Sequence, residues 1–269
     1  MKPIVTEAER FYTENPCLTD FHMHTHETYE IYFFLSGKAK YFVEGTVYSL
    51  KPGDLLLIKK GEAHTLLIQN STPYRRMVIH FGLSALRGEE GEKLVRFLEE
   101  RPLGKENRYS AAVFQTGRWE YYTEKVCTAA SLEEKGLYLT VLLWELYHAR
   151  HRIRDESAVY DNTAEIILYL NEHLTEPLSL DEICARFYVS KAQLNRKFKS
   201  VTGSTVWEYI KTKRLILAKG MLQSGIRPTV AAMKSGFQEY SAFFYAYKAK
   251  FSLSPKEEYR LGEGGASSK

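Results

Sequence analysis

Histidines and one glutamate near the N-terminus could bind a metal ion or a polar ligand. His22, His24 and His26 stand at alternate positions, Glu30 keeps the same parity, and His64 follows further along the chain. Alternate residues of an extended segment point to the same side, so an extended segment would bring the first four side chains onto one face. Imidazole and carboxylate groups coordinate divalent metals, and they also hydrogen bond to a sugar or a small acid.

Composition limits the class of protein that carries these groups. The chain has 269 residues, 44% hydrophobic and 26% charged, which is ordinary for a soluble protein of two domains. Its longest apolar runs, IYFFL, LLLI and TVLLW, are too short to cross a bilayer. The N-terminus lacks the apolar core of a secretory signal, so we expect a cytoplasmic protein without a membrane partner. Three widely spaced cysteines, Cys17, Cys127 and Cys184, argue against a disulfide framework or a structural zinc cluster.

The N-terminal third is predicted to form an all-β domain. Its candidate strands are short, rich in aromatic and β-branched residues, and separated by glycines and prolines. They span residues 29–35, 39–44, 46–50, 54–58, 63–69 and 74–81. Short strands at this spacing indicate a sandwich or a barrel. His80 falls on the last of these segments, and we interpret it as a core or capped histidine.

After Gly82 the apolar residues follow a helical spacing. Residues 89–98 and 119–126 are amphipathic, and residues 101–116 are predicted to be an irregular connection. In the segment LEEKGLYLTVLLWELYHAR one apolar stripe repeats every three or four positions: Leu139, Leu142, Leu146 and Ala149. That stripe could pack on the barrel or pair with its copy in a second subunit, and periodicity alone favours neither. The polar segment 151–160 ends the pattern and is predicted to be an interdomain linker.

From residue 161 onward every predicted element is helical. Ser179 and Ser190 each open a short helix with a capping-box pattern, and only a few residues of turn separate the two helices. Two short capped helices with a tight turn between them are typical of a helix-turn-helix. The second helix is predicted to bury Leu194, Phe198 and Val201, which leaves its other side free for a major groove.

This region is locally basic, although the whole chain has a net charge of only +4. Between Arg186 and Lys219 the chain has nine lysines and arginines against one acid, Glu208. A basic stretch without a motif is usually a solvated helix face. Here the basic residues accompany a DNA-binding motif, and an electrostatic attraction to nucleic acid is expected.

The N-terminal site resembles a cupin over roughly residues 15 to 82. Four residues match the first cupin motif in type and spacing: His24, His26, Glu30 and Gly37. Three match the second motif, within PGDLLLIKKGEAH: Gly53, Gly61 and His64. Lys59 replaces the proline of that motif, and Ile68 replaces its asparagine. In metal-binding cupins the residues that correspond to His24, His26, Glu30 and His64 hold one divalent ion.

Cupin sensor domains keep polar residues at the same place to hold an organic effector. We therefore interpret the site as the mouth of a sensor pocket, whose effector is bound by His22, His24, His26, Glu30 and His64. No cofactor is then required. A divalent metal on the last four of these residues is the alternative.

The C-terminal half resembles the DNA-binding domain of the AraC/XylS family of transcription activators. The first recognition helix and its end match the family at Ser190, Leu194, Arg196, Phe198, Lys199 and Gly203. The segment WEYIKTKRLILAKGMLQSG resembles the long helix that joins the family's two units. The second unit departs from type at Pro228, which opens its helix, at Tyr245, where a basic residue is common, and at Ser252, which replaces a glycine. Proline is tolerated in a first helical turn, but tyrosine cannot make the bidentate contact of arginine to guanine.

The resemblance implies that each unit lays its second helix in one of two successive major grooves of double-stranded DNA. The residues implied to read bases are Ala192, Asn195 and Arg196 in one groove, and Glu239, Tyr240, Ala242 and Tyr245 in the other. Phosphate contacts are expected from Lys191, Lys197, Lys199 and Lys248. Among these residues, Arg196 suits guanine and Asn195 suits adenine.

We therefore expect a chain of several domains. An all-β cupin-like barrel would span residues 1–82, with a helical connector, open to dimerisation, over 83–150. An all-α domain of two helix-turn-helix units joined by a long helix would span 161–262, before a disordered tail over 263–269.

The resemblance implies a homodimeric regulator and not an enzyme. Double-stranded DNA, RNA polymerase and a small-molecule effector would be its partners. Many family members with this layout govern carbohydrate-use genes, so a sugar or a related metabolite is the expected effector. A metal-responsive regulator and a metal-dependent enzyme fused to a DNA-binding domain are the alternatives.

Overall fold

The computed structural model describes residues 5–14, 16, 23–26, 28–82, 88–112, 117–152 and 162–266. The chain divides into two compact units, Met1–Tyr160 and Asp161–Lys269. The first is built on β-sheets and the second is helical, which confirms the predicted fold class. Across the described ranges, no helix is long and apolar enough to cross a membrane.

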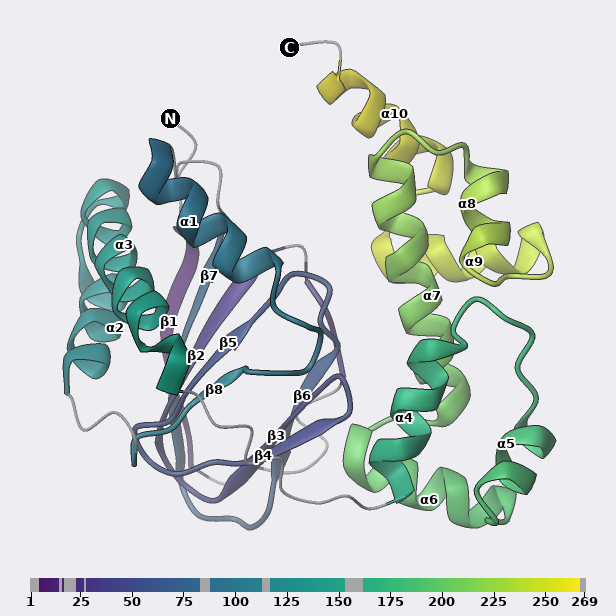
Figure 1. Ribbon diagram of the computed structural model, residues 1–269, viewed down its shortest axis with the longest axis horizontal. Helices are drawn as coiled ribbons and strands as arrows, with labels where there is room; N and C mark the ends of the chain where they lie inside the picture. Colours follow the sequence, from purple (N-terminus) through teal and green to yellow (C-terminus); the bar gives the residue numbers. More distant parts are fainter. Residues whose placement is uncertain are drawn as a thin grey trace. The chain divides into compact units, whose positions relative to one another are not determined.

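Two antiparallel sheets form the barrel of the N-terminal unit (Figure 1). The five-stranded sheet has the order β1 (Val5–Thr13), β7 (Tyr74–Phe81), β2 (Tyr29–Ser36), β5 (Leu55–Ile58) and β8 (Arg108–Tyr109). The three-stranded sheet has the order β4 (Thr46–Ser49), β3 (Ala39–Val43) and β6 (His64–Ile68). The strands predicted between residues 29 and 81 all form, each within one residue of its predicted bounds.

The two faces of the five-stranded sheet have different partners. On β2 and β7 the odd-numbered residues, such as Phe33 and Ile79, are buried in a core shared with the helices of this unit. The even-numbered residues, such as Tyr32 and Val78, belong to a second core inside the barrel. Alternate side chains of a strand point to opposite faces. Any polar residue at an even position of these strands is therefore directed into the barrel.

Three helices cover the outer face of this sheet (Figure 1). They are α1 (Gly88–Glu99), α2 (Arg118–Thr128) and α3 (Leu132–Ala149), and a short 3-10 turn, η2 (Arg150–Arg152), follows. Leu139, Leu142 and Leu146 of α3 are fully buried in the shared core. Each buried leucine stabilises this packing by about 1.5–3 kcal/mol. Of the two alternatives for this stripe, packing on the barrel is the one observed.

The prediction of an irregular connection over residues 101–116 is wrong in part, because it contains β8, which pairs with β5. The buried carboxylate of Glu62 organises this segment. It accepts hydrogen bonds from Arg101 Nη2 at 2.8 Å, Gly104 N at 2.8 Å and Asn107 Nδ2 at 3.0 Å. A strand of two residues is too short to show a period in the sequence, so the pattern could not predict it.

The helical unit consists of seven helices within its described residues 162–266. They are α4 (Asn162–Glu172), α5 (Leu180–Arg186), α6 (Lys191–Thr202), α7 (Val206–Gln223), α8 (Pro228–Lys234), α9 (Tyr240–Phe251) and α10 (Pro255–Ala266). Figure 1 shows α7 running the length of the unit, with α5 and α6 at one end and α8 and α9 at the other. Around the second end, Leu215 and Leu222 of α7 are buried with Phe243 and Tyr247 of α9.

The helix starts follow the capping signals, with one difference. Ser190 and Gln193 form the predicted capping box of α6, and Pro228 occupies the first turn of α8 as predicted. Ser179 caps α5 only through a bond to Asp181 N, so the reciprocal half of its predicted box is absent.

The buried face of α6 differs from the prediction at one residue, because Thr202 is fully buried whereas Val201 is half-buried. The Thr202 hydroxyl is satisfied there because it donates to Phe198 O at 2.9 Å.

Two further predictions concern segments at the edges of the units. Residues 151–152 of the predicted linker belong to η2, and residues 153–160 lie outside the described residues. The prediction of a disordered tail from residue 263 is wrong for residues 263–266, because α10 continues to Ala266. Once a helix is nucleated, adding a residue requires only that residue to be ordered, which favours continuation.

Candidate functional site

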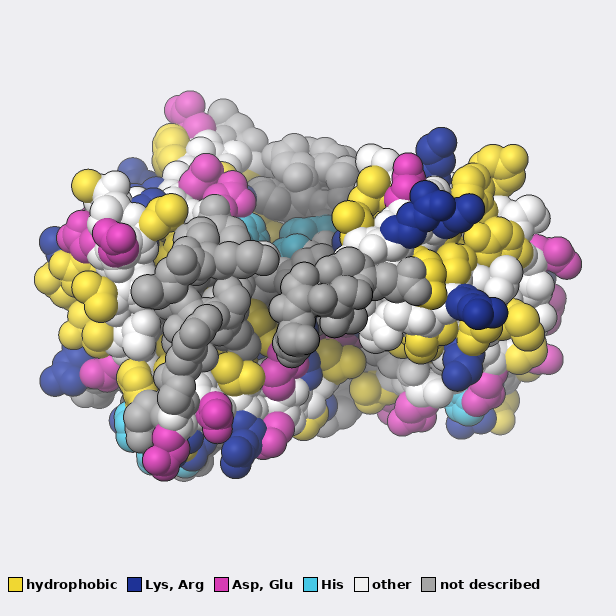
Figure 2. Space-filling model, turned by 90° about the horizontal axis from the view of Figure 1, so that it is seen from above, with side chains coloured by type: hydrophobic (Ala, Val, Ile, Leu, Met, Phe, Trp, Pro, Cys, Tyr) yellow, Lys and Arg dark blue, Asp and Glu magenta, His cyan; other side chains and the backbone are white. Residues whose placement is uncertain are grey.

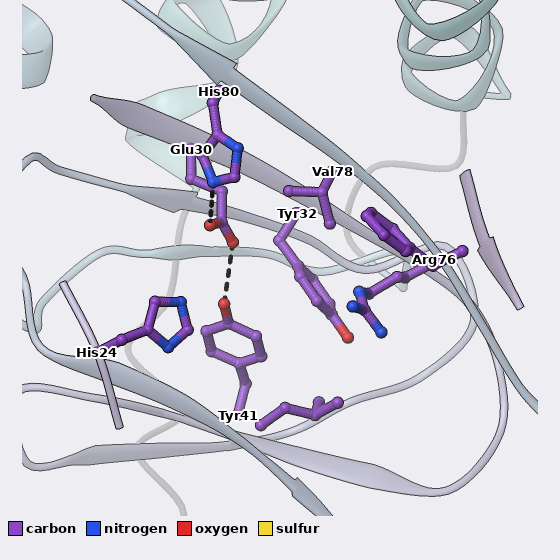
Figure 3. A pocket seen from close by; sticks show the side chains of 9 residues that line it. His24, Glu30, Tyr32, Tyr41, Arg76, Val78 and His80 are labelled. Carbon is purple, nitrogen blue, oxygen red and sulfur yellow. Dashed lines mark hydrogen bonds and ion pairs between the residues drawn. The ribbon is translucent and has the colours of Figure 1, made fainter. Parts of the chain in front are cut away.

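Four histidines and a tyrosine of the barrel lie near one buried carboxylate. Glu30 is 3% exposed, and its Oε2 lies 3.0 Å from His26 Nε2, 3.1 Å from His80 Nε2 and 3.7 Å from His64 Nε2. Tyr41 donates its hydroxyl to Glu30 Oε1 at 2.9 Å. Figure 3 shows the Glu30 carboxylate between His80 and Tyr41. The carboxylate thus organises side chains from several strands.

The backbone explains why these residues meet. His24 and His64 form an isolated antiparallel bridge, with N–H···O bonds of 3.1 Å in both directions. Their rings lie 4.4 Å apart between centroids, and the His26 ring lies 4.9 Å from that of His64. Glu30 and His80 are direct cross-strand partners on β2 and β7. Side chains opposite each other on one face of a sheet are close neighbours.

The electrostatics of the cluster are dominated by Glu30. Burial alone would raise the pKa of Glu30, but hydrogen bonds from the surrounding histidines hold it well below its usual value. Burial would lower the pKa of His64, and its interaction with Glu30 raises it instead. The bond to Glu30 also raises the pKa of His80. Burial, together with the Glu30 charge, raises the pKa of Tyr41, so its hydroxyl stays a hydrogen-bond donor.

The donor set fits a divalent cation. His24, Glu30 and His64 offer one ligand atom each within 4.8 Å of one another, and His26, Glu30 and His80 form a second such group. His64 Nε2 is buried and has no hydrogen-bond partner within the described structure. Imidazole with carboxylate suits zinc, manganese, iron or nickel.

A cavity of about 140 Å³ lies beside the cluster (Figure 3). Its walls are the side chains of Phe11, His24, Glu30, Tyr32, Tyr41, Leu66, Arg76, Val78 and His80. Apolar and aromatic walls with a few placed polar groups are typical of small-molecule sites. A more open cleft of about 590 Å³ shares His24 and His80 with it.

The structure brings together most of the residues that the sequence pointed to. His24, His26, Glu30 and His64 converge, whereas His22 lies outside the described residues. His80, interpreted as a core or capped histidine, is half-buried and hydrogen-bonded to Glu7 and Glu30, and it also lines the cavity, which the sequence did not predict. Sequence reasoning also missed the other polar residues of the cavity wall: Tyr32, Tyr41 and Arg76. The sequence does contain a signal for these residues. Tyr32, Arg76 and His80 occupy even-numbered positions of β2 and β7, as Glu30 does, and side chains at alternate positions of a strand share one face.

Helix α6 presents its predicted DNA-reading residues on its exposed side. The exposed ones are Lys191, Ala192, Arg196, Lys197 and Lys199, and Asn195 is half-buried. Asn195 Nδ2 donates to Lys191 O at 3.2 Å, and Lys191 Nζ pairs with Asp181 at 2.7 Å. Among the described residues Arg196 forms no such local bond, so its guanidinium is the stronger candidate for a base contact.

Helix α9 exposes the second predicted set: Glu239, Tyr240, Ala242, Tyr245 and Lys248. Tyr245 is 72% exposed, which is unusual for so large an aromatic side chain. On the face that Figure 2 shows, lysines and arginines of the helical unit are scattered among hydrophobic side chains and do not form one continuous basic patch.

Arg214 of α7 ties the two ends of the helical unit together. Its Nε donates to Leu174 O at 2.8 Å and its Nη2 donates to Glu176 O at 2.7 Å, both just after α4. Gly236, between α8 and α9, lies so close that a Cβ there would stand 2.8 Å from Arg214 Nε. The turn of the second unit is therefore packed against a side chain that is bonded to the first.

The chain matches two family models. Residues 11–115 match an AraC-like ligand binding domain, and residues 183–260 match a helix-turn-helix domain. The barrel site lies within the first match, and α6 and α9 lie within the second.

The relatives of the chain are regulatory proteins by name, which agrees with the prediction that it is not an enzyme. The chain is 35% identical over 103 residues to the transcriptional regulator Rob of Salmonella typhimurium, which is 38% of this chain and 36% of Rob. It is 31% identical over 94 residues to the regulatory protein SoxS of Escherichia coli, which is 35% of this chain and 88% of SoxS. The chain thus spans about a third of the length of Rob and most of the length of SoxS.

A solved structure of ToxT from Vibrio cholerae is similar to the whole chain at low identity. The match covers 95% of this chain and 98% of ToxT, with a TM-score of 0.41 and 16% sequence identity. Likeness at this level does not extend to function.

Proposed function

The chain belongs to the AraC family of DNA-binding transcriptional regulators, and we propose that its DNA binding is controlled by a small molecule held in the N-terminal barrel. The effector is a sugar or a related metabolite. The observation that carries this proposal is the cavity of about 140 Å³ with Glu30, His80 and Tyr41 in its wall. A carboxylate, an imidazole and a phenol can together accept and donate hydrogen bonds to ligand hydroxyl groups.

Strand β7 offers a route from the effector to the rest of the molecule. Its residues Val78 and His80 line the cavity, while Met77 and Ile79, on the opposite face, are buried against the helix-covered core. A ligand that moves β7 also moves the surface on which α2 and α3 pack. Close-packed interiors transmit such shifts because they contain little free space. An effector with different affinities for two arrangements of the protein then shifts the balance between them.

The test uses the thermodynamic coupling between effector and DNA. A genomic binding map identifies the operator, and the neighbouring genes suggest the effector class. Calorimetric titration of that effector is then performed with the free protein and with the protein bound to operator DNA. Effector affinity must differ between the two states, because coupling between binding sites is reciprocal. Equal affinities in both states would refute control of DNA binding by the effector.

For DNA recognition, we propose that α6 and α9 enter two successive major grooves. The exposed side chains on both helices support this reading, and Arg196 is the residue proposed to contact guanine. Arg214 supports a fixed spacing between the two helices, since it contacts both ends of the unit. RNA polymerase is the proposed partner of the protein at the promoter.

A homodimer is proposed through the outer side of α3. Leu137 and Val141 are 70% and 40% exposed, and Trp144 continues this side one turn further. Their spacing of four and three residues places them on one stripe, which is distinct from the buried one. A symmetric dimer uses the same patch on both copies, and a straight apolar stripe on a helix can pack against itself in this way.

A metal-responsive regulator is the second candidate function. The buried, unpartnered Nε2 of His64 favours it, because a coordinated ion would satisfy that atom. His24, Glu30 and His64 would hold the ion, with His26 and His80 beside them. The ion would act as the signal or would orient an oxygen of the effector.

Elemental analysis of the purified protein separates the two candidates. A metal-responsive regulator contains about one equivalent of metal, which is lost in His24→Ala and His64→Ala. His173→Ala is the matched control, because His173 belongs to the helical unit and pairs locally with Glu176. Metal content that is absent, or that is unchanged in the barrel variants, would refute the second candidate.

A further inference from the structure

One tyrosine of the first helix-turn-helix has a backbone conformation that does not suit its side chain. Tyr188, in the turn between α5 and α6, has a φ of 53°, which lies in the left-handed region. There the Cβ of an L-residue crowds the following carbonyl oxygen, so glycine is favoured. Within the described residues of the helical unit, Ser252 is the one other residue besides glycine with a positive φ.

The second helix-turn-helix has glycine at the equivalent place. Gly236 follows the C-cap of α8 and has a φ of 93°, just as Tyr188 follows the C-cap of α5. In both turns the amide of the next residue donates to a carbonyl oxygen five residues earlier, at 3.1 Å. Glycine therefore satisfies a turn of this kind, and the turn itself does not explain why the first unit has a tyrosine.

Packing within the helical unit does not explain the tyrosine either. Tyr188 is 95% exposed, and among the described residues its hydroxyl forms no hydrogen bond and its ring meets no other ring. Two basic residues nearby in the chain do have local partners. The guanidinium carbon of Arg186 lies 4.6 Å from the ring centroid of Tyr169, and Lys191 Nζ lies 2.7 Å from Asp181 Oδ1. The Tyr188 hydroxyl is thus an available hydrogen-bond donor on this turn.

Tyr188 lies at the end of α6 that is proposed to meet DNA. The other end of α6 joins α7 through residues 203–205, and Figure 1 shows the turn between α5 and α6 at the end away from α7. A helix of 12 residues is about 18 Å long, so the two ends are well separated. A recognition helix contacts base edges with its N-terminal residues. Tyr188 precedes Ser190, the N-cap of α6, by two residues and is therefore beside the edge of the groove.

We propose that Tyr188 contacts the DNA backbone at the edge of the groove that α6 enters. Its hydroxyl donates a hydrogen bond to a phosphate oxygen, and its ring covers the neighbouring deoxyribose. Tyrosine is one of the side chains that bond to phosphate oxygens in protein–DNA complexes, and such contacts fix the register of a helix without reading bases. Backbone strain at functional sites is commonly offset by what the site binds. The inference rests on the proposed entry of α6 into a major groove.

The test measures DNA affinity and stability on the same variants of the full-length protein. Tyr188→Gly removes the side chain and the strain together, and Tyr188→Phe removes only the hydroxyl. Ser252→Gly is the matched control, because it relieves the same backbone conformation at the C-terminal end of α9. Arg196→Ala reports separately whether α6 meets DNA. Fluorescence anisotropy with operator and scrambled duplexes at several salt concentrations gives the affinity, and thermal unfolding gives the stability.

The two measurements on Tyr188→Gly are expected to change in opposite directions. Its melting temperature should rise by roughly 4 °C, because the strain is removed. Its DNA affinity should fall by about 10-fold, the loss expected for a hydrogen bond to a charged group. The loss should be equal on both duplexes, because a phosphate contact reads no sequence. The salt dependence should not change, because an uncharged hydroxyl releases no counterions.

The two other substitutions separate the hydroxyl from the backbone. Tyr188→Phe should lose most of the same affinity at unchanged stability, because it keeps the ring and the backbone conformation. Ser252→Gly should gain stability and keep the wild-type affinity, because the C-terminal end of α9 is remote from the proposed contact.

Four outcomes would overturn the inference. Unchanged affinity in Tyr188→Gly beside a weakened Arg196→Ala removes Tyr188 from DNA binding and leaves the proposed role of α6 intact. Unchanged affinity in both variants overturns that role as well. A lower melting temperature for Tyr188→Gly shows that the fold itself needs the tyrosine. Wild-type affinity in Tyr188→Phe removes the bond to phosphate.

Discussion

Glu30 is a buried carboxylate that its neighbours keep ionised. Burial disfavours the charged form, and the hydrogen bonds from His26 and His80, together with the nearby ring of His64, outweigh that effect. The same bonds fix the orientation of the imidazole rings, because a hydrogen bond at one ring nitrogen decides what the other can do. Loss of this one side chain would therefore release the rings of His26, His80 and Tyr41 at once, which makes Glu30 the organising residue of the site.

Arg196→Ala tests base reading at a single side chain. We expect a loss of about 1–3 kcal/mol in operator binding and a relaxed preference at one base pair. Lys197→Ala, on the same exposed helix, is the control and should weaken binding to operator and random DNA alike, with a smaller salt dependence. Fluorescence anisotropy with operator and scrambled duplexes measures both. An equal loss on the two duplexes for Arg196→Ala would exclude direct base reading.

Ser252 ends α9 in a backbone conformation that suits glycine. Its φ is 58°, and Gly203 ends α6 in the same left-handed region with a φ of 73°. Ser252→Gly should stabilise the helical unit by about 1 kcal/mol, because glycine adopts this region without strain. Gly203→Ser is the converse change and should destabilise it. Urea unfolding monitored by circular dichroism measures both, and a destabilised Ser252→Gly would refute the assignment of strain.

At the residue scale, motif spacing predicts His24, His26, Glu30 and His64, because cupin motifs record residue type at fixed positions along the chain. It does not predict Arg76, which belongs to no motif. Arg76 enters the site through the register of β7 against β2, a long-range pairing that a single sequence does not encode locally.

At the scale of elements, α3 carries two apolar stripes with different destinations. Leu139, Leu142 and Leu146 are buried in the core of the barrel unit, whereas Leu137 and Val141 are exposed. Periodicity in the sequence identified the first stripe and could not assign its partner. A helix that is apolar on more than one side has a second surface to cover, and a second subunit can provide the cover.

Leu137→Asp tests whether the exposed stripe forms the dimer. The variant should be monomeric by analytical ultracentrifugation with little change in thermal stability, since Leu137 is 70% exposed. Leu139→Ala is the contrast: it should destabilise the fold by about 2–5 kcal/mol, because Leu139 is fully buried. A Leu137→Asp variant with the same sedimentation behaviour as the wild type would place the dimer interface elsewhere.

Elements with a strong local pattern were predictable, and elements defined by a distant partner were not. The strands between residues 29 and 81 alternate and are bounded by turn residues, so their limits follow from the sequence. The segment VTEAERFYT of β1 has mostly polar residues, and it becomes a strand through its pairing with β7. β8 likewise forms where the Glu62 carboxylate orders the chain beside β5.

At the scale of the whole molecule, the two units contain separate cores. A fragment of residues 162–269 should therefore fold alone and bind operator DNA without any response to the effector. Anisotropy titrations of the fragment and the full chain, each with and without effector, measure this. An effector response in the isolated fragment would contradict control from the barrel, and a fragment that does not fold would contradict independent cores.

Strand β7 divides its residues between two tasks by parity. Arg76, Val78 and His80 line the cavity, and Met77 and Ile79 belong to the core under the helices. Substitutions at the first set change what the barrel can hold without requiring the second set to repack. New effector specificities are thus accessible to evolution, or to a designer, by point substitution along one strand. Inserting a single residue into β7 would instead turn each following side chain to the other face of the sheet. Residues that line the cavity and residues that belong to the core would then exchange places.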